Sequence, residues 1–233
     1  MGRKKQTREE LQKLTYAERV DYYSHINNLL SINNGNAKTG IGCLTMSMPP
    51  ISCRIDAPCK KGCYCMKGHQ VYPTVVGAYY RNWRLWNEDP INFEKQLEAF
   101  ITFSGAILFR YNDAGEIPDE KFLAMMFRIA EKLPEVKFLA YTKKYEMINE
   151  FLDEGNKIPN NLTIRFSYWD KDWEVPNPYN LPTAYVDFKE TDKNPIFPSK
   201  IFSCPAIGGS PITCSSCKVC WNKAVKSVKF HQH

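Results

Sequence analysis

Short apolar segments alternate with amphipathic segments along the middle of this 233-residue chain. The patterns predict strands at residues 41–48, 106–111, 136–141, 162–168, 184–188 and 200–202, and helices at 71–86, 93–103, 118–133 and 144–153. Because strands that alternate with helices form parallel β/α units, the sequence predicts an α/β fold. About six strands suit a partial barrel of the (β/α)6 type better than a closed eight-stranded barrel.

Two extensions of different character flank this alternating body. Residues 7–32 have the apolar spacing of an amphipathic helix, which Thr7 can cap and which the Asn-Asn-Gly sequence at 33–35 ends. We therefore expect an N-terminal helical extension over residues 1–40. The β/α body follows over residues 41–203 and contains a cysteine loop at 53–65. A cysteine-rich, cluster-binding tail occupies residues 204–233.

Eight of the nine cysteines fall into two sets. The first set is Cys53, Cys59, Cys63 and Cys65, and the second set is Cys204, Cys214, Cys217 and Cys220. Closely spaced thiolates can surround a soft metal centre, because a tight loop brings several sulfurs to one point. The ninth, Cys43, lies within a predicted strand and is expected to be a small buried apolar residue.

The spacing within each set favours iron–sulfur clusters over zinc. The second set contains Cys-x2-Cys-x2-Cys, which is the spacing around four-iron clusters, whereas structural zinc sites use two separated Cys-x2-Cys pairs. In the first set, Cys63 and Cys65 are separated by a single residue, and all four thiols are not expected to bind one cluster easily. Cys53, Cys59 and Cys63 are then the preferred ligands, and one iron of the cluster has no protein ligand. Two 4Fe–4S clusters are expected, with zinc as the main rival.

Polar residues follow several of the predicted strands. Sites of parallel α/β folds form at the carboxyl ends of the strands, so these residues are expected to share one rim. The candidates for binding a small cofactor there are Asn112, Asp113, Gly115, Glu116 and Ser167. Ordinary turn formation is the alternative, because Asn, Asp and Gly favour turns.

Charge and hydropathy restrict the classes of partner. The net charge of +6 permits contact with nucleic acid but does not require it. The chain has no run of about 18 apolar residues and no secretory signal pattern, so we expect neither a membrane span nor export. Nine cysteines without a signal indicate a reducing compartment, the cytoplasm, where thiols bind metals more often than they form disulfides.

Two resemblances rest on particular residues. Cys59-x3-Cys63, directly after a first strand, resembles the radical S-adenosylmethionine enzymes, and Gly115-Glu116 stands where that family holds the methionine amino group. That family's Cys-x3-Cys-x2-Cys motif has its third position at Met66 here. Over most of the chain, the pieces 109–115, 141–143 and 177–180 and the terminal Cys-x2-Cys-x2-Cys-Trp resemble the gene product 88 family of bacteriophages and mobile elements. The resemblance implies a radical-enzyme-like body with cysteine-bound clusters.

The residues and the resemblance leave three functions open. In the first, the chain is an iron–sulfur protein of phage type that acts as an enzyme and cleaves S-adenosylmethionine at an open four-iron cluster. Alternatively, it is a non-enzymatic iron–sulfur protein for redox sensing, electron transfer or partner binding. The weaker alternative is a zinc-stabilised nucleic-acid-binding protein. For a phage-encoded chain, the expected compartment is the cytoplasm of the host cell. A fourth protein ligand on the first cluster would favour the non-enzymatic function, because a closed cluster has no place for a substrate.

Overall fold

The structure is a computed structural model that describes residues 5–206 and 210–232. In this part of the chain, eight strands form one open sheet in the order β1-β2-β3-β4-β5-β6-β8-β7. The strands are β1 (Ile32–Asn33), β2 (Cys43–Met46), β3 (Leu108–Tyr111), β4 (Lys137–Thr142), β5 (Leu162–Tyr168), β6 (Thr183–Asp187), β7 (Phe202–Ser203) and β8 (Ser227–His231). Only β1 is antiparallel to its neighbour; the other pairs are parallel.

The mixed α/β class expected from the sequence is confirmed, and the sheet is not closed. The helices are α1 (Arg8–Gln12), α2 (Tyr16–Ser24), α3 (Pro73–Glu88), α4 (Pro90–Ser104), α5 (Glu120–Lys132), α6 (Tyr145–Asp153) and α7 (Cys214–Cys217). Four of them, α3 to α6, lie within a few residues of the expected helices. Asp89 separates α3 from α4, and its carboxylate accepts a hydrogen bond from the N–H of Asn92 at 3.0 Å, which caps α4.

The single helix expected over residues 7–32 is wrong. Thr15 begins a second helix because its hydroxyl accepts the N–H of Glu18, while the Glu18 carboxylate accepts the N–H of Thr15 at 2.8 Å. This capping box ends α1 and starts α2. The chain then leaves the helix at Ser24 and adds β1 as an antiparallel edge strand. The tail also contains a further strand, β8, which the sequence analysis did not predict.

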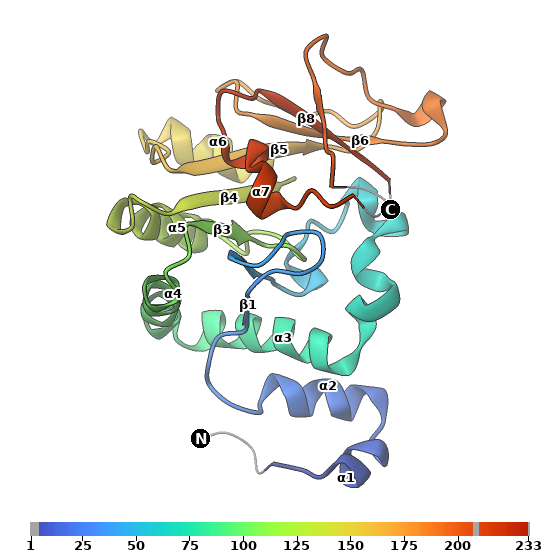
Figure 1. Cartoon of the computed structure of the whole chain (residues 1–233), viewed down its shortest axis with the longest axis vertical. Helices are drawn as coiled ribbons and strands as arrows, with labels where there is room; N and C mark the ends of the chain where they lie inside the picture. The colour runs from blue at the N-terminus through green and yellow to red at the C-terminus, as the bar shows by residue number, and fades with distance from the viewer. Residues whose placement is uncertain (1–4, 207–209, 233) are drawn as a thin grey trace.

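The two faces of the sheet pack against different parts of the chain. Side chains alternate along a strand, and one face, which is mainly apolar, packs against the helices; it includes Leu44, Met46, Phe109, Tyr111, Phe138, Ala140, Leu162, Ile164 and Phe166. In Figure 1, α4, α5 and α6 lie together along one side of the sheet. The opposite face carries Cys43, Leu108 and Leu139, and Trp221 of the cysteine-rich tail packs on them.

The cysteine loop and the tail therefore meet at the second face. Figure 1 shows α7 in front of the strands and the loop that follows β2 close to the C-terminus. Four short 3-10 turns shape this loop: Pro50–Ser52, Pro58–Gly62, Tyr64–Met66 and Gly68–Val71. Among the described helices, none combines the length and the apolar character needed to cross a membrane.

Candidate functional site

A cavity of about 550 Å³ lies between the cysteine loop, the strand ends and the tail. Six of the eight predicted cysteine ligands line it: Cys59, Cys63, Cys204, Cys214, Cys217 and Cys220. Members of the two cysteine sets, which are about 140 residues apart in sequence, thus line one cavity. A volume of this size falls in the range of small-molecule sites in proteins.

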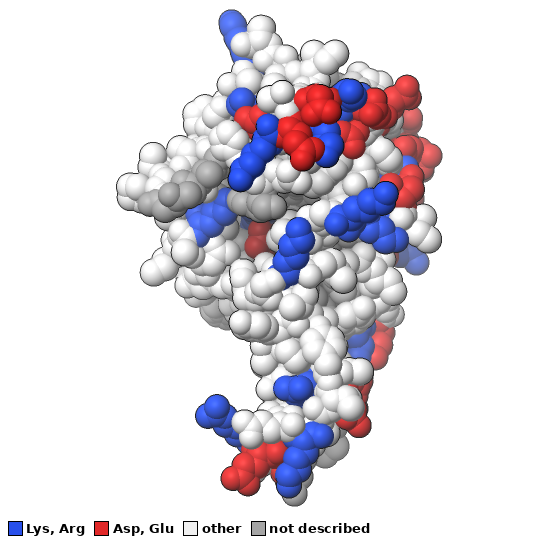
Figure 2. Space-filling view, turned by 90° about the vertical axis from the view of Figure 1, so that its right-hand side faces the viewer, with Lys and Arg blue, Asp and Glu red and all other residues white. Residues whose placement is uncertain are grey.

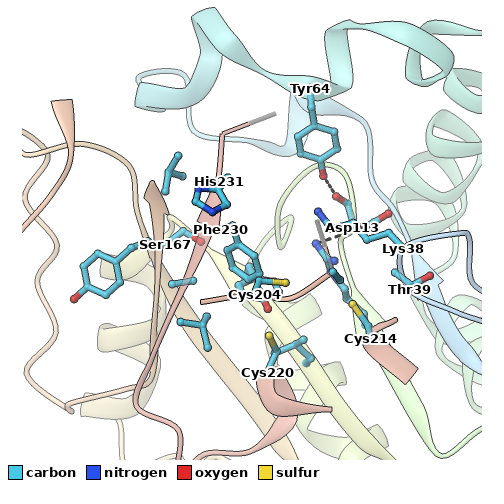
Figure 3. A pocket seen from close by; sticks show the side chains of 18 of the residues that line it. Lys38, Thr39, Tyr64, Asp113, Ser167, Cys204, Cys214, Cys220, Phe230 and His231 are labelled. Atoms are coloured by element: carbon cyan, nitrogen blue, oxygen red, sulfur yellow. Dashed lines mark hydrogen bonds and ion pairs between the residues drawn. The ribbon is translucent and has the colours of Figure 1, made fainter. Parts of the chain in front are cut away.

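The second cysteine set is gathered by the tail and by a loop near the N-terminus. Cys214 and Cys217 lie one turn apart on α7, so their side chains share a face of that helix. The backbone N–H of Cys214 donates to the carbonyl of Lys38 at 3.1 Å, and that of Cys204 donates to the carbonyl of Lys229 at 2.9 Å. Figure 3 shows Cys204, Cys214 and Cys220 around one part of the cavity.

The first set is split by the structure. Cys59 and Cys63 line the cavity, whereas Cys53 and Cys65 do not. Burial is the main cause that raises the pKa of Cys53 to about 12, and the nearby Glu116, Cys59 and Cys63 act in the same direction. Cys65 is buried and accepts a hydrogen bond from the backbone N–H of Gly115.

Burial raises the pKa of several of these thiols. It raises the pKa of Cys59 and Cys220, and it raises the pKa of Cys214 to about 11. Cys63 differs, because a hydrogen bond from the Cys65 thiol lowers its pKa, with the nearby Lys143 ammonium acting in the same direction. Cys63 is therefore more readily ionised than Cys59, Cys214 and Cys220.

Basic and aromatic side chains complete the wall. The Arg110 guanidinium forms an ion pair with the Asp113 carboxylate at 3.1 Å and lies 5.0 Å from the centre of the Tyr141 ring. The Lys143 ammonium lies 5.8 Å from the centre of the Trp169 ring. Tyr64 reaches into the cavity from the cysteine loop, and its hydroxyl donates to the carbonyl of Asp113 (Figure 3).

The predicted rim residues occupy different positions. Asp113 and Ser167 line the cavity, whereas Asn112, Gly115 and Glu116 are not part of its wall. Asn112 has a left-handed backbone with φ of 52° and is buried. The Glu116 carboxylate accepts hydrogen bonds from the Thr142 hydroxyl and the Lys143 N–H, both at 2.8 Å. These bonds join the ends of β3 and β4.

Arg165 on β5 is a site residue that the sequence analysis missed. Its side chain is fully buried, and its guanidinium donates to the carbonyls of Cys220 and Asn222 at 2.8 and 3.0 Å. The available signal was a single arginine inside the apolar segment Leu162–Tyr168. A charge in the middle of a buried strand requires a polar partner.

The donors fit a soft metal centre in their chemistry. Each set contains four thiols, of which two in the first set and all four in the second line the cavity, and thiolates are the ligands that iron–sulfur clusters and structural zinc use. In the described ranges, no group of three or more His, Cys, Asp or Glu side chains is arranged to hold a metal ion. Metal binding at either set would therefore require its thiols to turn toward one another.

Comparison with known proteins gives one family. The family model described as Gene product 88 matches residues 21–223, which include both cysteine sets. No curated protein and no solved structure matches the chain.

Proposed function

The chain belongs to the gene product 88 family, and we propose that it is an iron–sulfur protein whose two cysteine sets hold clusters on the walls of one cavity. The single observation that carries this proposal is the presence of six cysteines from both sets in the wall of that cavity. Unrelated structural thiols have no reason to converge in this way from distant parts of the chain.

The chemistry of the site follows from its walls. When bound, an iron–sulfur cluster supplies single electrons to a molecule close to it. The protein contributes the cavity, the aromatic side chains of Tyr141 and Trp169, and the cations Arg110 and Lys143. The reducing cytoplasm of a host cell, consistent with a phage-type family, is the compartment this proposal requires.

Anaerobic purification followed by metal analysis tests the proposal. The protein should be brown and should contain iron together with acid-labile sulfide. Cys59→Ser and Cys217→Ser should each lose part of the iron, whereas Cys43→Ala should retain all of it, because Cys43 packs in the apolar cluster beneath Trp221. A colourless protein with stoichiometric zinc would contradict the proposal.

A second candidate function is the cleavage of S-adenosylmethionine by a radical mechanism. The observation that favours it is that Asp113 and Ser167, two of the polar strand-end residues, line the same cavity as Cys59 and Cys63. Cys53, Cys59 and Cys63 would hold the cluster, and an iron without a protein thiolate would accept the amino and carboxylate groups of the substrate.

Electron paramagnetic resonance of the dithionite-reduced protein, with and without S-adenosylmethionine, decides between the enzyme and a non-enzymatic role. The enzyme requires a changed spectrum and release of 5′-deoxyadenosine. An identical spectrum from fully loaded protein, without nucleoside, would leave redox sensing, electron transfer or partner binding as the function.

The face shown in Figure 2 gives little support to a nucleic-acid-binding function. On the face shown in Figure 2, basic side chains stand singly or in small groups, and acidic side chains gather at its upper end. A continuous basic stripe, which tracks a phosphate backbone, is not present on this face.

A further inference from the structure

Arg165 is an unusual residue in the floor of the second cysteine site. Its relative exposure is 0%, and it projects from β5 on the face of the sheet that carries the tail. An arginine side chain remains charged at any pH at which a protein is folded. The structure therefore places a permanent positive charge in the interior, directly beneath the cysteine-rich tail.

The hydrogen bonds of Arg165 lead mainly to the tail. Its Nε donates to the carbonyl of Cys220 at 2.8 Å, and one Nη donates to those of Asn222 and Val219 at 3.0 and 3.4 Å. The other Nη donates to the carbonyl of Thr183 at 3.4 Å. The donors of the guanidinium are thus satisfied, but only by neutral carbonyl groups.

Within residues 5–206 and 210–232, no carboxylate forms an ion pair with the charge of Arg165. By contrast, Arg110, which lines the cavity, forms an ion pair with the Asp113 carboxylate at 3.1 Å. An unpaired buried charge is strongly unfavourable. The described protein groups therefore leave Arg165 without the anion that would stabilise its charge.

We propose that Arg165 is the buried counter-ion of an anionic metal–thiolate centre held by Cys204, Cys214, Cys217 and Cys220. Thiolates around zinc or an iron–sulfur core carry more negative charge than the metal supplies positive charge, so the centre is an anion. Arg165 contacts the backbone of Cys220 and so lies directly behind one ligand. The inference rests on metal binding at this set, as proposed above, but holds for iron and zinc alike.

Metal competition with a chelator measures the proposed role. Arg165→Met keeps the volume and removes the charge, so it should weaken binding at the second set by about 10- to 100-fold, the usual effect of losing a group behind a ligand. Arg165→Lys keeps the charge and should retain most of the affinity. Arg81→Met is the matched control, because Arg81 donates to the carbonyl of Tyr23 far from the cavity; its metal affinity should not change.

Thermal unfolding with and without metal distinguishes a counter-ion role of Arg165 from a purely structural role. If Arg165 only stabilises the fold through its hydrogen bonds to backbone carbonyls, Arg165→Met should lower the melting temperature equally in metal-loaded and metal-free protein. This result would overturn the proposal. A counter-ion predicts a clearly larger loss in the loaded protein, because the metal-free protein has no anion to compensate. If the centre is a cluster, its reduction potential should also become more negative in Arg165→Met.

One further variant distinguishes failure of the inference from failure of its premise. If Cys217→Ser binds as much metal as the wild type, the second set holds no metal. Metal binding at this set and the counter-ion role of Arg165 are then both rejected. If Cys217→Ser loses metal while Arg165→Met binds it with wild-type affinity, metal binding stands and the counter-ion role alone is rejected.

Discussion

Cys63 and Cys65 lie one residue apart, yet their thiols have opposite tendencies to ionise. The Cys65 thiol donates to Cys63, which lowers the pKa of Cys63 and, together with burial, raises that of Cys65. Thiolates, not thiols, are alkylated and bind metals. Cys63 is thus the residue of the first set that is best prepared to bind metal at neutral pH.

Alkylation of metal-free protein checks this order. With increasing pH, the reaction of Cys63 with iodoacetamide should reach its plateau first, because its pKa is lowered, while Cys59 and Cys214 should react only at higher pH. Cys65→Ala removes the donor, so the rate at Cys63 should fall at pH 7 and the rate at Cys59 should stay unchanged. Peptide mass spectrometry resolves the sites, and equal profiles for all of them would contradict the prediction.

The sequence reveals residue types at a site more readily than their surroundings. Cysteine spacing marked eight residues, and the structure brings six of them to one cavity. The alternation of strands and helices placed Asp113 and Ser167 near the same edge, but it could not show that Glu116 turns inward to bond Thr142. That depends on the packing of neighbouring loops, which a strand pattern does not specify.

At the scale of elements, the turn after β3 is hydrogen-bonded to the segment that begins the cysteine loop. The N–H of Asp113 donates to the carbonyl of Met46 at 3.1 Å, and the N–H of Glu116 donates to the Ser52 hydroxyl at 2.8 Å. Gly115 makes this close approach possible, because it has φ of 77° and a Cβ there would lie 2.4 Å from the carbonyl oxygen of Met48. This contact gives Gly115 a structural role independent of any cofactor.

Gly115→Ala should therefore destabilise the protein more than Gly155→Ala. Both glycines have positive φ, which costs an L residue about 1–2 kcal/mol, but a Cβ at Gly155 would meet nothing within 4 Å. Only Gly115→Ala must also displace backbone, and it should lower the metal content of the first set. Urea unfolding of the two variants measures the difference, and equal losses would show that the turn can move freely.

The elements that the sequence did not reveal are short or locally capped. The region expected as one helix from residue 7 is divided at Thr15 by a capping box, whose Ser/Thr-x-x-Glu pattern was present in the sequence but lay within a longer apolar period. β8 has only five residues, with alternating character, at the end of a charged tail. Its assignment depends on pairing with β6, a contact between segments about 40 residues apart.

At the scale of the whole molecule, the sheet depends on its last strand. β8 lies between β6 and β7 and pairs with β6 from Ser227 to His231. The Lys229 ammonium also forms an ion pair with the Asp187 carboxylate at 2.8 Å, and Val228 and Phe230 line the cavity. The tail is consequently part of the body and one wall of the site.

Two truncations test this dependence. A chain ending at Lys226 keeps all nine cysteines but loses β8, so it should unfold at a much lower temperature, with a broad transition, and should bind little metal at Cys204. A chain lacking residues 1–14 loses α1, which contains no buried residue, and should shift the melting temperature by only a few degrees. The first truncation removes no thiol. Its loss of metal would therefore come from the loss of β8, whose Lys229 carbonyl accepts a hydrogen bond from the Cys204 N–H and positions that residue. Wild-type metal content and melting temperature in that chain would mean that the tail binds metal without the sheet.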